Sequence, residues 1–208
     1  MIDDISSRFL VNLPNSEFCS FDRVMYHLQC ASWFYQDYLR HQYQTQSLST
    51  RNFCHMMFNR SAILRPYLSQ FDRIYRSFVD YMNNIDVFGC MIWSRNNTHV
   101  LLIRGPTGYW SFPKGKRNQD EMGLDCARRE VWEETGLDMG PFLHKDTPSR
   151  TRRIYNRRLT MYVVHVDRKR FPIRWKHVDQ TEVTDIRWVP TSEIMGRRYP
   201  TVLPFLRN

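Results

Sequence analysis

The spacing of hydrophobic residues changes near residue 85. Before that point, apolar residues recur at intervals of three and four, which is the period of an amphipathic helix. From Val87 onward, short β-branched and aromatic runs alternate with polar turns, which is typical of strands. The pair Asn83-Asn84 interrupts the helical pattern. The sequence therefore predicts an all-helical domain over 1–82, a hinge over 83–86 and a second domain of strands and helices over 87–208, an α+β organisation.

In the first part, the longest predicted helix begins at the cap-like pair Ser16-Glu17 and continues to about His41. Its apolar positions project on one side, while Trp33 and Asp37 fall on the polar side. The other predicted helices span 2–13, 51–59 and 66–82.

In the second part, residues 87–93 and 99–105 flank a polar turn and predict a β-hairpin. One helix is predicted from Asp120 to Thr135, with acids in its first turn and Gly136 just past its end. A short helix is expected to start at Thr191. Further strands are predicted at 109–112, 142–145, 152–155, 158–166 and 185–189.

The long helix of the second part carries clustered carboxylates. Glu130, Glu133 and Glu134 stand at positions i, i+3 and i+4, so they share one helix face. Like charges repel one another at this spacing, and a bound hard divalent cation such as Mg²⁺ would offset the repulsion between these carboxylates. A solvated acidic face is the alternative. The amines of Lys114 and Lys116, which flank a glycine just before this helix, favour a site for a metal ion and a diphosphate.

The spacing of these residues resembles the Nudix hydrolase box at every defined position. The pattern reads Gly115-x5-Glu121-x7-Arg129-Glu130-Val131-x-Glu133-Glu134-x-Gly136-Leu137. The flanking segments 110–116 and 125–131 resemble, more specifically, the catalytic-subunit family of the eukaryotic mRNA decapping enzyme. The resemblance extends over nearly the whole chain, and it implies a Nudix α/β/α sandwich after the helical domain.

The resemblance also implies roles for the box residues. Glu130 and Glu134 would be the main ligands of Mg²⁺ or Mn²⁺, with Glu133 assisting and the carbonyl of Gly115 completing the site. Glu121 and Arg129 would form an ion pair that fixes the loop against the helix.

The general base is implied less directly. Glu182 precedes a Val and an Ile-x-Trp strand, as in a second block of the family, and a carboxylate near a metal-bound water could serve as the base. Asp179 and Asp185 are rival candidates. Alternatively, Glu182 pairs with a nearby cation, for which the choices are Arg174, Lys176 and Arg187.

Trp33 and Asp37 offer a second candidate site in the helical domain. A tryptophan on a polar face either packs on a partner or serves as a platform on which a nucleobase stacks. Asp37 could accept hydrogen bonds from the N–H groups of that base. Residues 31–37 resemble the signature of the N-terminal regulatory domain of the decapping family. That resemblance implies that Trp33 and Asp37 contact the 7-methylguanine of the cap, and the two domains are expected to close on the cap.

The positive charge is concentrated at the end of the chain. Of the net charge of +9, residues 141–208 hold 15 basic and six acidic side chains. Such an excess favours a polyanion such as RNA over a solubilising surface, and a membrane surface is the weaker alternative. The predicted RNA contacts are Lys114, Lys116, Arg168, Lys169, Arg170, Arg174, Lys176 and, from the resemblance to a terminal helix region, Tyr199.

Other protein classes fit the sequence poorly. No apolar run approaches the length of a membrane span, and the five scattered cysteines include no CxxC pair, which argues against zinc or a disulfide framework and favours a reducing compartment. The resemblance implies a cytoplasmic protein, also found in P-bodies, with the nucleus as the alternative.

The expected function is metal-dependent hydrolysis of the triphosphate bridge of the mRNA cap, which releases 7-methyl-GDP and RNA with a 5′-monophosphate and initiates mRNA decay. Capped mRNA is the expected partner, and a small activating decapping subunit on the helical domain is compatible with the resemblance. Two alternatives stay open. One is a Nudix hydrolase of free nucleotides or inositol pyrophosphates, and the other is an inactive RNA-binding scaffold.

Overall fold

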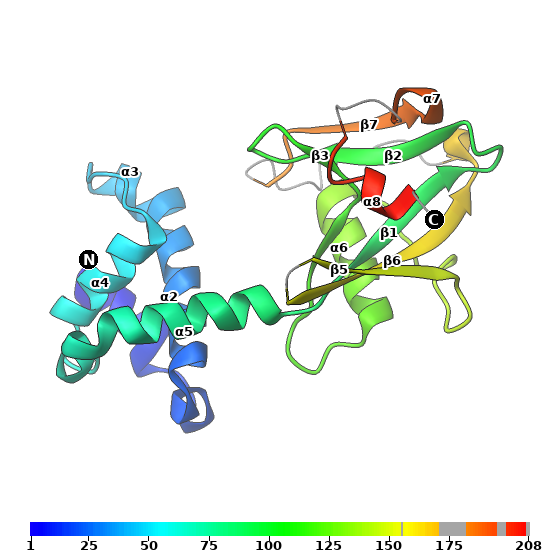
Figure 1. Ribbon diagram of the computed structural model, residues 1–208. Helices are drawn as coiled ribbons and strands as arrows, with labels where there is room; N and C mark the ends of the chain where they lie inside the picture. The colour runs from blue at the N-terminus through cyan, green and yellow to red at the C-terminus, as the bar shows by residue number, and fades with distance from the viewer. Residues whose placement is uncertain (155, 171–181, 195–198, 207–208) are drawn as a thin grey trace. The chain divides into compact units, whose positions relative to one another are not determined.

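The computed structural model describes residues 1–154, 156–170, 182–194 and 199–206. The chain divides into two compact units, Met1–Asn83 and Asn84–Asn208 (Figure 1). Among the described residues, no helix has the length and apolar character needed to cross a membrane.

The first unit is entirely helical, as predicted. Its longest helical run, from Phe21 to Gln42, buries Val24, Met25, Leu28 and Tyr35 against α4 and keeps Trp33 on the exposed side. The helices of this unit are α1 Ile2–Ser6, η1 Ser7–Val11, η2 Asn15–Cys19, α2 Phe21–Phe34, η3 Tyr35–Leu39, α3 Arg40–Gln42, α4 Thr50–Arg60, η4 Arg65–Gln70 and α5 Phe71–Asn84.

Two helix boundaries in this unit differ from the prediction, and one predicted helix is divided into two. The helix predicted from Ser16 begins at Phe21, because the Ser20 side chain accepts the Arg23 N–H at 3.4 Å and Glu17 instead pairs with Arg23 and His27. The segment 66–82 is a 3₁₀ helix followed by α5. This helix continues through Asn84, so the first two residues of the predicted hinge are helical and the hinge itself stays a prediction.

The second unit is built on a mixed sheet, which has seven strands among the described residues. The strand order is β3-β2-β1-β6-β5, β4 pairs with β1, and β7 pairs with β2. The central β1 and β6 are parallel over eight residue pairs, from Val87–Leu159 to Ser94–Val166. The strands are β1 Val87–Ser94, β2 His99–Arg104, β3 Trp110–Ser111, β4 Lys114–Lys116, β5 Ser149–Ile154, β6 Arg157–Val166 and β7 Asp185–Pro190.

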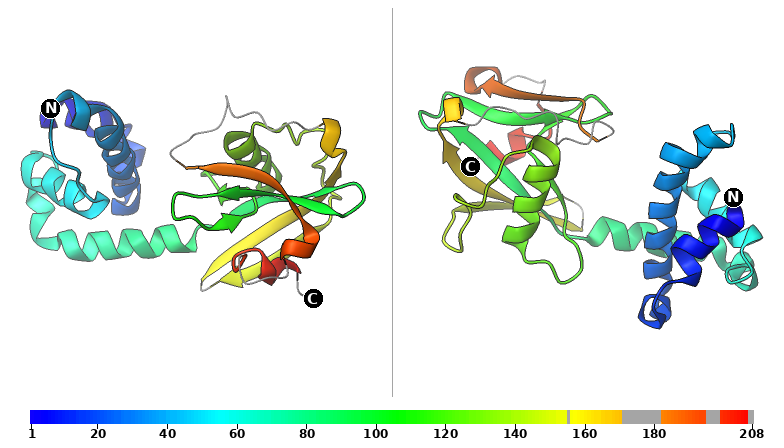
Figure 2. Two further views of the ribbon diagram at one scale, coloured as in Figure 1. Left: turned by 90° about the horizontal axis from the view of Figure 1, so that it is seen from above. Right: turned by 180° about the vertical axis from the view of Figure 1, so that it is seen from behind.

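The sheet separates two apolar layers, which makes the predicted sandwich (Figure 2). Alternate residues of β1 point to opposite faces. Phe88, Cys90 and Ile92 pack with α6, while Val87 and Met91 pack with the segment around α8.

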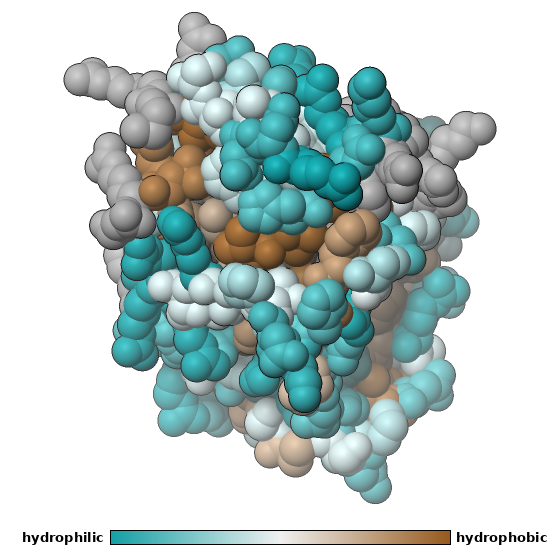
Figure 3. All heavy atoms as spheres, turned by 90° about the vertical axis from the view of Figure 1, so that its right-hand side faces the viewer, coloured by the Kyte–Doolittle hydropathy of each residue, from teal (hydrophilic) through white to brown (hydrophobic). Residues whose placement is uncertain are grey.

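On the face that Figure 3 displays, hydrophobic side chains reach the surface in a central area surrounded by hydrophilic ones. The helices of this unit are α6 Gly123–Thr135, η5 Arg168–Arg170, α7 Thr191–Ile194 and α8 Leu203–Leu206.

Two predictions in the second unit were wrong. The helix predicted from Asp120 to Thr135 begins at Gly123, because Asp120 has a left-handed φ of 57° that a helix does not accommodate. Residues 142–145 form turns and not a strand. The hairpin, the strand at 158–166 and the left-handed Gly136 (φ 68°) are confirmed.

Candidate active site

Gly115 and Glu130 lie against each other where β4 packs on α6. An ideal Cβ on Gly115 would overlap the carboxylate of Glu130. Only glycine, which has no side chain, therefore leaves space for this carboxylate. Burial raises the pKa of Glu130, with the guanidinium of Arg129 opposing and the charges of Glu133 and Glu182 adding to the rise. The missing side chain at Gly115 therefore lets a half-buried carboxylate sit over the backbone of β4.

Glu134 lies in the same place, one helical turn further along α6. Its Oε2 accepts a hydrogen bond from the backbone N–H of Lys114 at 2.7 Å. Burial raises the pKa of Glu134 to about 8, against the lowering effect of Lys114. Burial also lowers the pKa of Lys114, whose Nζ donates to the Ser111 Oγ at 3.0 Å. The amine of Lys114 thus lies within this site beside Ser111, and its predicted contact with RNA stays a prediction.

Glu182 comes from the segment that precedes β7. The backbone N–H of Thr184, two residues on, donates to the carbonyl of Arg104 at 2.8 Å, which anchors this segment at the end of β2. The Glu182 carboxylate is exposed, yet its charge raises the pKa of both Glu130 and Glu134. The fold therefore brings Glu182 into electrostatic range of the two box carboxylates.

Arg129 is the centre of a network that holds the turn before α6. Its Nε and Nη2 donate to the two carboxylate oxygens of Glu121 at 2.8 and 2.9 Å, the forked geometry of a strong arginine–carboxylate pair. Its Nη2 also donates to the Lys116 carbonyl at 3.1 Å. Its Nη1 donates to Glu130 at 2.7 Å. Hydrogen bonding to Arg129 lowers the pKa of Glu121, so this carboxylate is a charged structural partner.

Glu133 differs from its two neighbours. Its side chain is 51% exposed, and its Oε2 accepts from Arg129 at 2.9 Å. Within the described residues, no three acidic, histidine or cysteine side chains are arranged as a ready metal cluster. Glu130 and Glu134 both lie against β4, with Glu182 in electrostatic range of them, while Glu133 faces the arginine.

The residues at this site nonetheless fit a hard divalent cation. In the described part of the chain, Glu134 Oε1 and Glu130 Oε2 have no hydrogen-bond donor. The carbonyl of Gly115 belongs to β4, which pairs with β1 beside these carboxylates. Carboxylate and carbonyl oxygens are the donors that Mg²⁺ and Mn²⁺ prefer. Burial raises the pKa of these carboxylates and repulsion between them adds to the rise, and a cation would offset both effects.

The remaining predicted residues lie elsewhere. Trp33 is 49% exposed and Asp37 is exposed, both in the helical unit. Arg168 and Lys169 are exposed in η5, which also includes Arg170, and Lys116 is half-buried on β4. Tyr199 is 7% exposed and packs in the apolar layer near α8, which does not suit an RNA contact. Arg174, Lys176 and Asp179 lie outside the described residues, and Asp185 pairs with Arg187 at 2.6 Å.

Arg157, at the start of β6, is a site neighbour that the sequence analysis missed. Burial lowers the pKa of Lys114 and of Lys116, and the positive charge of Arg157 lowers both pKa values further. The sheet register explains this proximity, because Val87 of β1 pairs with Lys116 on one side and with Leu159 on the other. Only the pairing of β1 with β6, which no local pattern reveals, brings Arg157 near the box.

Two family models match the chain. The "Dcp2, box A domain" matches residues 1–81, and the "NUDIX domain" matches residues 84–207. The "mRNA-decapping enzyme subunit 2" of Arabidopsis thaliana is 36% identical over 70% of this chain and 40% of its own length. The "mRNA decapping complex subunit 2" of Schizosaccharomyces pombe is 31% identical over 99% of this chain and 29% of its own.

A third relative is the "m7GpppN-mRNA hydrolase" of Saccharomyces cerevisiae, which is 28% identical over 99% of this chain and 21% of its own length. The chain therefore spans 40% or less of the length of each of these relatives.

Proposed function

The chain belongs to the NUDIX domain family, and we propose that it is a metal-dependent hydrolase of the mRNA 5′ cap. It would cleave the triphosphate bridge and release 7-methyl-GDP and RNA with a 5′-monophosphate. The observation that carries the proposal is the pair Glu130 and Glu134 beside Gly115, in a chain that also matches the Dcp2 box A domain. The printed names of the relatives support the capped substrate.

Glu130, Glu134 and the Gly115 carbonyl would hold the metal ion, which is Mg²⁺ or Mn²⁺ in this proposal, with Glu182 nearby. The bound ion would neutralise charge on the bridging phosphates and acidify a water molecule. Arg129 fixes the carboxylate of Glu130, and the Lys114 backbone N–H fixes that of Glu134. Glu182, exposed and close to both, would accept the proton of the attacking water.

Trp33 and Asp37 are proposed to recognise the cap base. A half-exposed indole offers a face on which a cationic 7-methylguanine stacks favourably, and Asp37 can accept a hydrogen bond from its N–H edge. The helical unit is also the proposed site for a small activating subunit. Basic residues of the second unit, including Lys116, Arg168 and Lys169, would bind the RNA chain.

The direct test is incubation of the protein with cap-labelled RNA and Mg²⁺ or Mn²⁺, followed by identification of the released nucleotide. Labelled 7-methyl-GDP is expected from the wild-type protein and not from Glu134→Gln. A control reaction uses free nucleotides and inositol pyrophosphates at the same concentration. Preferential turnover of those small diphosphates, or no turnover of any substrate, would contradict the proposal.

A further inference from the structure

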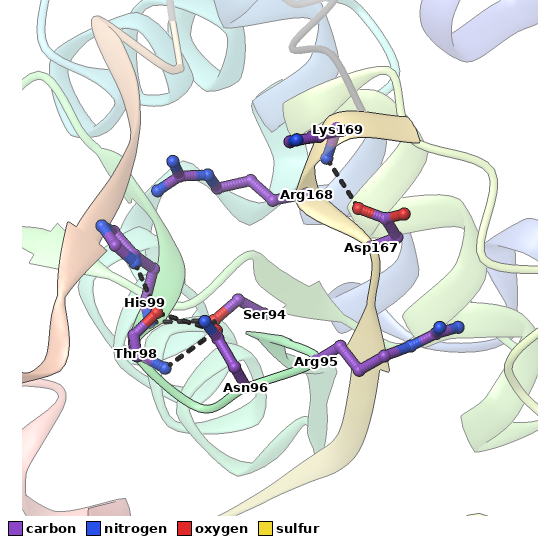
Figure 4. Close-up of a pocket in the computed structure, with 8 residues that line it drawn as sticks. All are labelled: Ser94, Arg95, Asn96, Thr98, His99, Asp167, Arg168 and Lys169. Carbon is purple, nitrogen blue, oxygen red and sulfur yellow. Dashed lines mark hydrogen bonds between the residues drawn. The ribbon is translucent and has the colours of Figure 1, made fainter.

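A basic pocket lies at the end of β1 that is remote from β4. It has a volume of about 430 Å³ and is formed by the β1–β2 turn together with the end of β6 and η5 (Figure 4). Three of its lining residues are cations, namely Arg95, Arg168 and Lys169. From its charge and hydrogen-bonding groups, we infer that this turn pocket binds phosphate groups of an RNA backbone, an inference that rests on the proposed function for the identity of the polyanion.

The floor of the turn pocket is held in place by its own hydrogen bonds. The Asn96 Oδ1 accepts from the hydroxyls of Ser94 at 2.9 Å and Thr98 at 2.7 Å, and the His99 N–H donates to the Ser94 Oγ at 2.9 Å. The backbone N–H of Arg95 donates to the Val166 carbonyl at 2.9 Å, which joins the turn to β6. The pocket is therefore preformed, so little ordering would be needed when a ligand binds.

The charge of the turn pocket favours an anion. Three cations and the carboxylate of Asp167 leave a formal net charge of about +2 among these four residues. No ion pair joins Arg95, Arg168 or Lys169 to a carboxylate within the described parts of the chain. Asp167 instead accepts the backbone N–H of Lys169 at 3.1 Å, which helps to shape η5. Figure 4 shows the Arg168 side chain extending toward the side of the pocket where His99 lies.

The hydrogen-bonding groups favour a phosphate over a base. The available donors are the N–H groups of the guanidinium and ammonium side chains and of the Asn96 amide. The described residues provide no acceptor for the Asn96 amide nitrogen. Among the described lining residues, His99 is the one aromatic ring, so the pocket offers no large surface for stacking. Contacts to phosphate oxygens position a nucleic acid without reading its sequence. We therefore expect sequence-independent binding.

The position of the pocket sets the length of RNA that can use it. At Val87, β1 pairs with Lys116 beside the candidate active site, and at Ser94 the same strand enters the pocket. Strands rise about 3.3 Å per residue, so the seven steps along β1 span roughly 23 Å. Stacked nucleotides advance about 3.4 Å each. An RNA strand that keeps this stacked spacing therefore needs about seven nucleotides beyond the scissile bond to reach both places.

The first experiment measures binding of an uncapped, fluorescently labelled 25-nucleotide RNA by anisotropy at several salt concentrations, without reference to catalysis. The double variant Arg168→Ala/Lys169→Ala is expected to bind roughly tenfold more weakly at low salt. Its plot of log K against log salt should lose about 1.4 in slope, since each contact of a cation with a single-strand phosphate contributes about 0.7. These side chains are exposed, so the fold should be unaffected.

The matched control compares Lys169→Ala with Lys145→Ala, which removes an exposed lysine outside the pocket. Lys169→Ala should reduce the salt slope, and Lys145→Ala should not. An unchanged slope in the double variant would overturn the inference. So would RNA binding at wild-type strength together with lost binding of poly-glutamate, because the pocket would then serve an acidic protein partner.

The second experiment compares hydrolysis of capped RNAs of 4 and 25 nucleotides. In the double variant, the rise in KM is expected to be at least fivefold larger for the long RNA than for the short one. An equal rise in KM for the two RNAs would contradict the inference that only the long RNA reaches from the active site to the turn pocket. If the wild-type protein releases no 7-methyl-GDP, the proposed function fails, but the anisotropy experiment still decides whether the turn pocket binds RNA.

Discussion

Glu133 and Glu134 are adjacent on α6, yet their surroundings differ. Glu134 is half-buried and hydrogen-bonded to the Lys114 backbone, whereas Glu133 is 51% exposed and paired with Arg129. We expect Glu134→Gln to lower kcat for capped RNA by at least about 100-fold, because it removes a charged oxygen donor from the proposed metal site. Glu133→Gln should cost less than about tenfold. Single-turnover kinetics with both variants at saturating Mg²⁺ would measure this difference.

Comparable losses in the two variants would show that Glu133 also binds the metal ion, against the orientation seen here. Thermal unfolding provides the control for folding. Both variants should unfold within a few degrees of the wild-type protein, because a carboxamide has nearly the same size as a carboxylate.

Two glycines separate the requirements of the site from those of the fold. A Cβ at Gly115 would overlap the mobile end of the Glu130 side chain, which can move aside. A Cβ at Gly89 would overlap the Pro113 carbonyl and the Lys114 backbone, which cannot move without separating β4 from β1. Gly115→Ala should therefore reduce kcat strongly with a small change in Tm. Gly89→Ala should destabilise the unit by about 3 kcal/mol, a typical cost of overpacking.

Activity assays and thermal unfolding on the same preparations would test this contrast. A Gly115→Ala protein with full activity would mean that Glu130 does not need the place that it occupies over β4.

At this scale, the sequence predicted which residues meet but not all of their surroundings. The helical spacing placed Glu130 and Glu134 on one face, because an α-helix has a fixed period. The ion pair of Glu121 with Arg129, which the structure confirms, came from the resemblance to the family. The half-buried position of Lys114 depends on β4, a strand of three residues without an apolar pattern. Tyr199 was predicted from a resemblance alone, and packing in the apolar layer determines its position.

At the scale of elements, helix starts were the least predictable feature. Ser16 and Ser20 are both good N-cap residues, and the structure uses Ser20 for α2. The displaced Glu17 of η2 lies between Arg23 and His27 of α2 instead. Similarly, the left-handed Asp120 ends the turn before α6, so the acids at 120 and 121 precede this helix. Local preference allowed either start in each case, and tertiary contacts decided.

The position of Glu17 makes the stability of the helical unit depend on pH. Hydrogen bonds from Arg23 and His27 lower the pKa of Glu17 to about 2. A carboxylate whose folded pKa lies below its unfolded value adds stability above the unfolded value of 4.5 and loses it as the pH falls toward 2. Glu17→Gln should therefore lower Tm at pH 7 and have almost no effect near pH 2.

Calorimetry between pH 2 and pH 7 would measure this convergence. The control is Asp80→Asn, at an exposed carboxylate of α5, which should leave Tm nearly unchanged at every pH. A Tm difference for Glu17→Gln that stays constant with pH would show that packing, and not charge, links η2 to α2.

For the whole molecule, the change of hydrophobic period near residue 85 predicted two units, because helices and strands present apolar residues at different intervals. The order of the strands was not predictable in this way. The parallel pairing of β1 with β6 joins segments far apart in the sequence, and it builds both the surroundings of Lys116 and the turn pocket. Long-range pairing of this kind leaves no local signal.

The division into two units suggests that recognition of the cap base and recognition of the RNA chain can be separated by mutation. Trp33 is 49% exposed in the helical unit, whereas the cations of the turn pocket belong to the second unit. We expect Trp33→Ala to reduce the preference for a 7-methylated over an unmethylated cap by about tenfold, since stacking on a base contributes about 1–3 kcal/mol. The affinity for uncapped RNA should stay within twofold of the wild-type value. Competition by methylated and unmethylated cap analogues would measure the preference, with Tyr43→Ala as a control at an exposed aromatic residue of the same unit. If Trp33→Ala discriminated between the two caps as well as the wild-type protein does, the indole would belong to a protein interface instead.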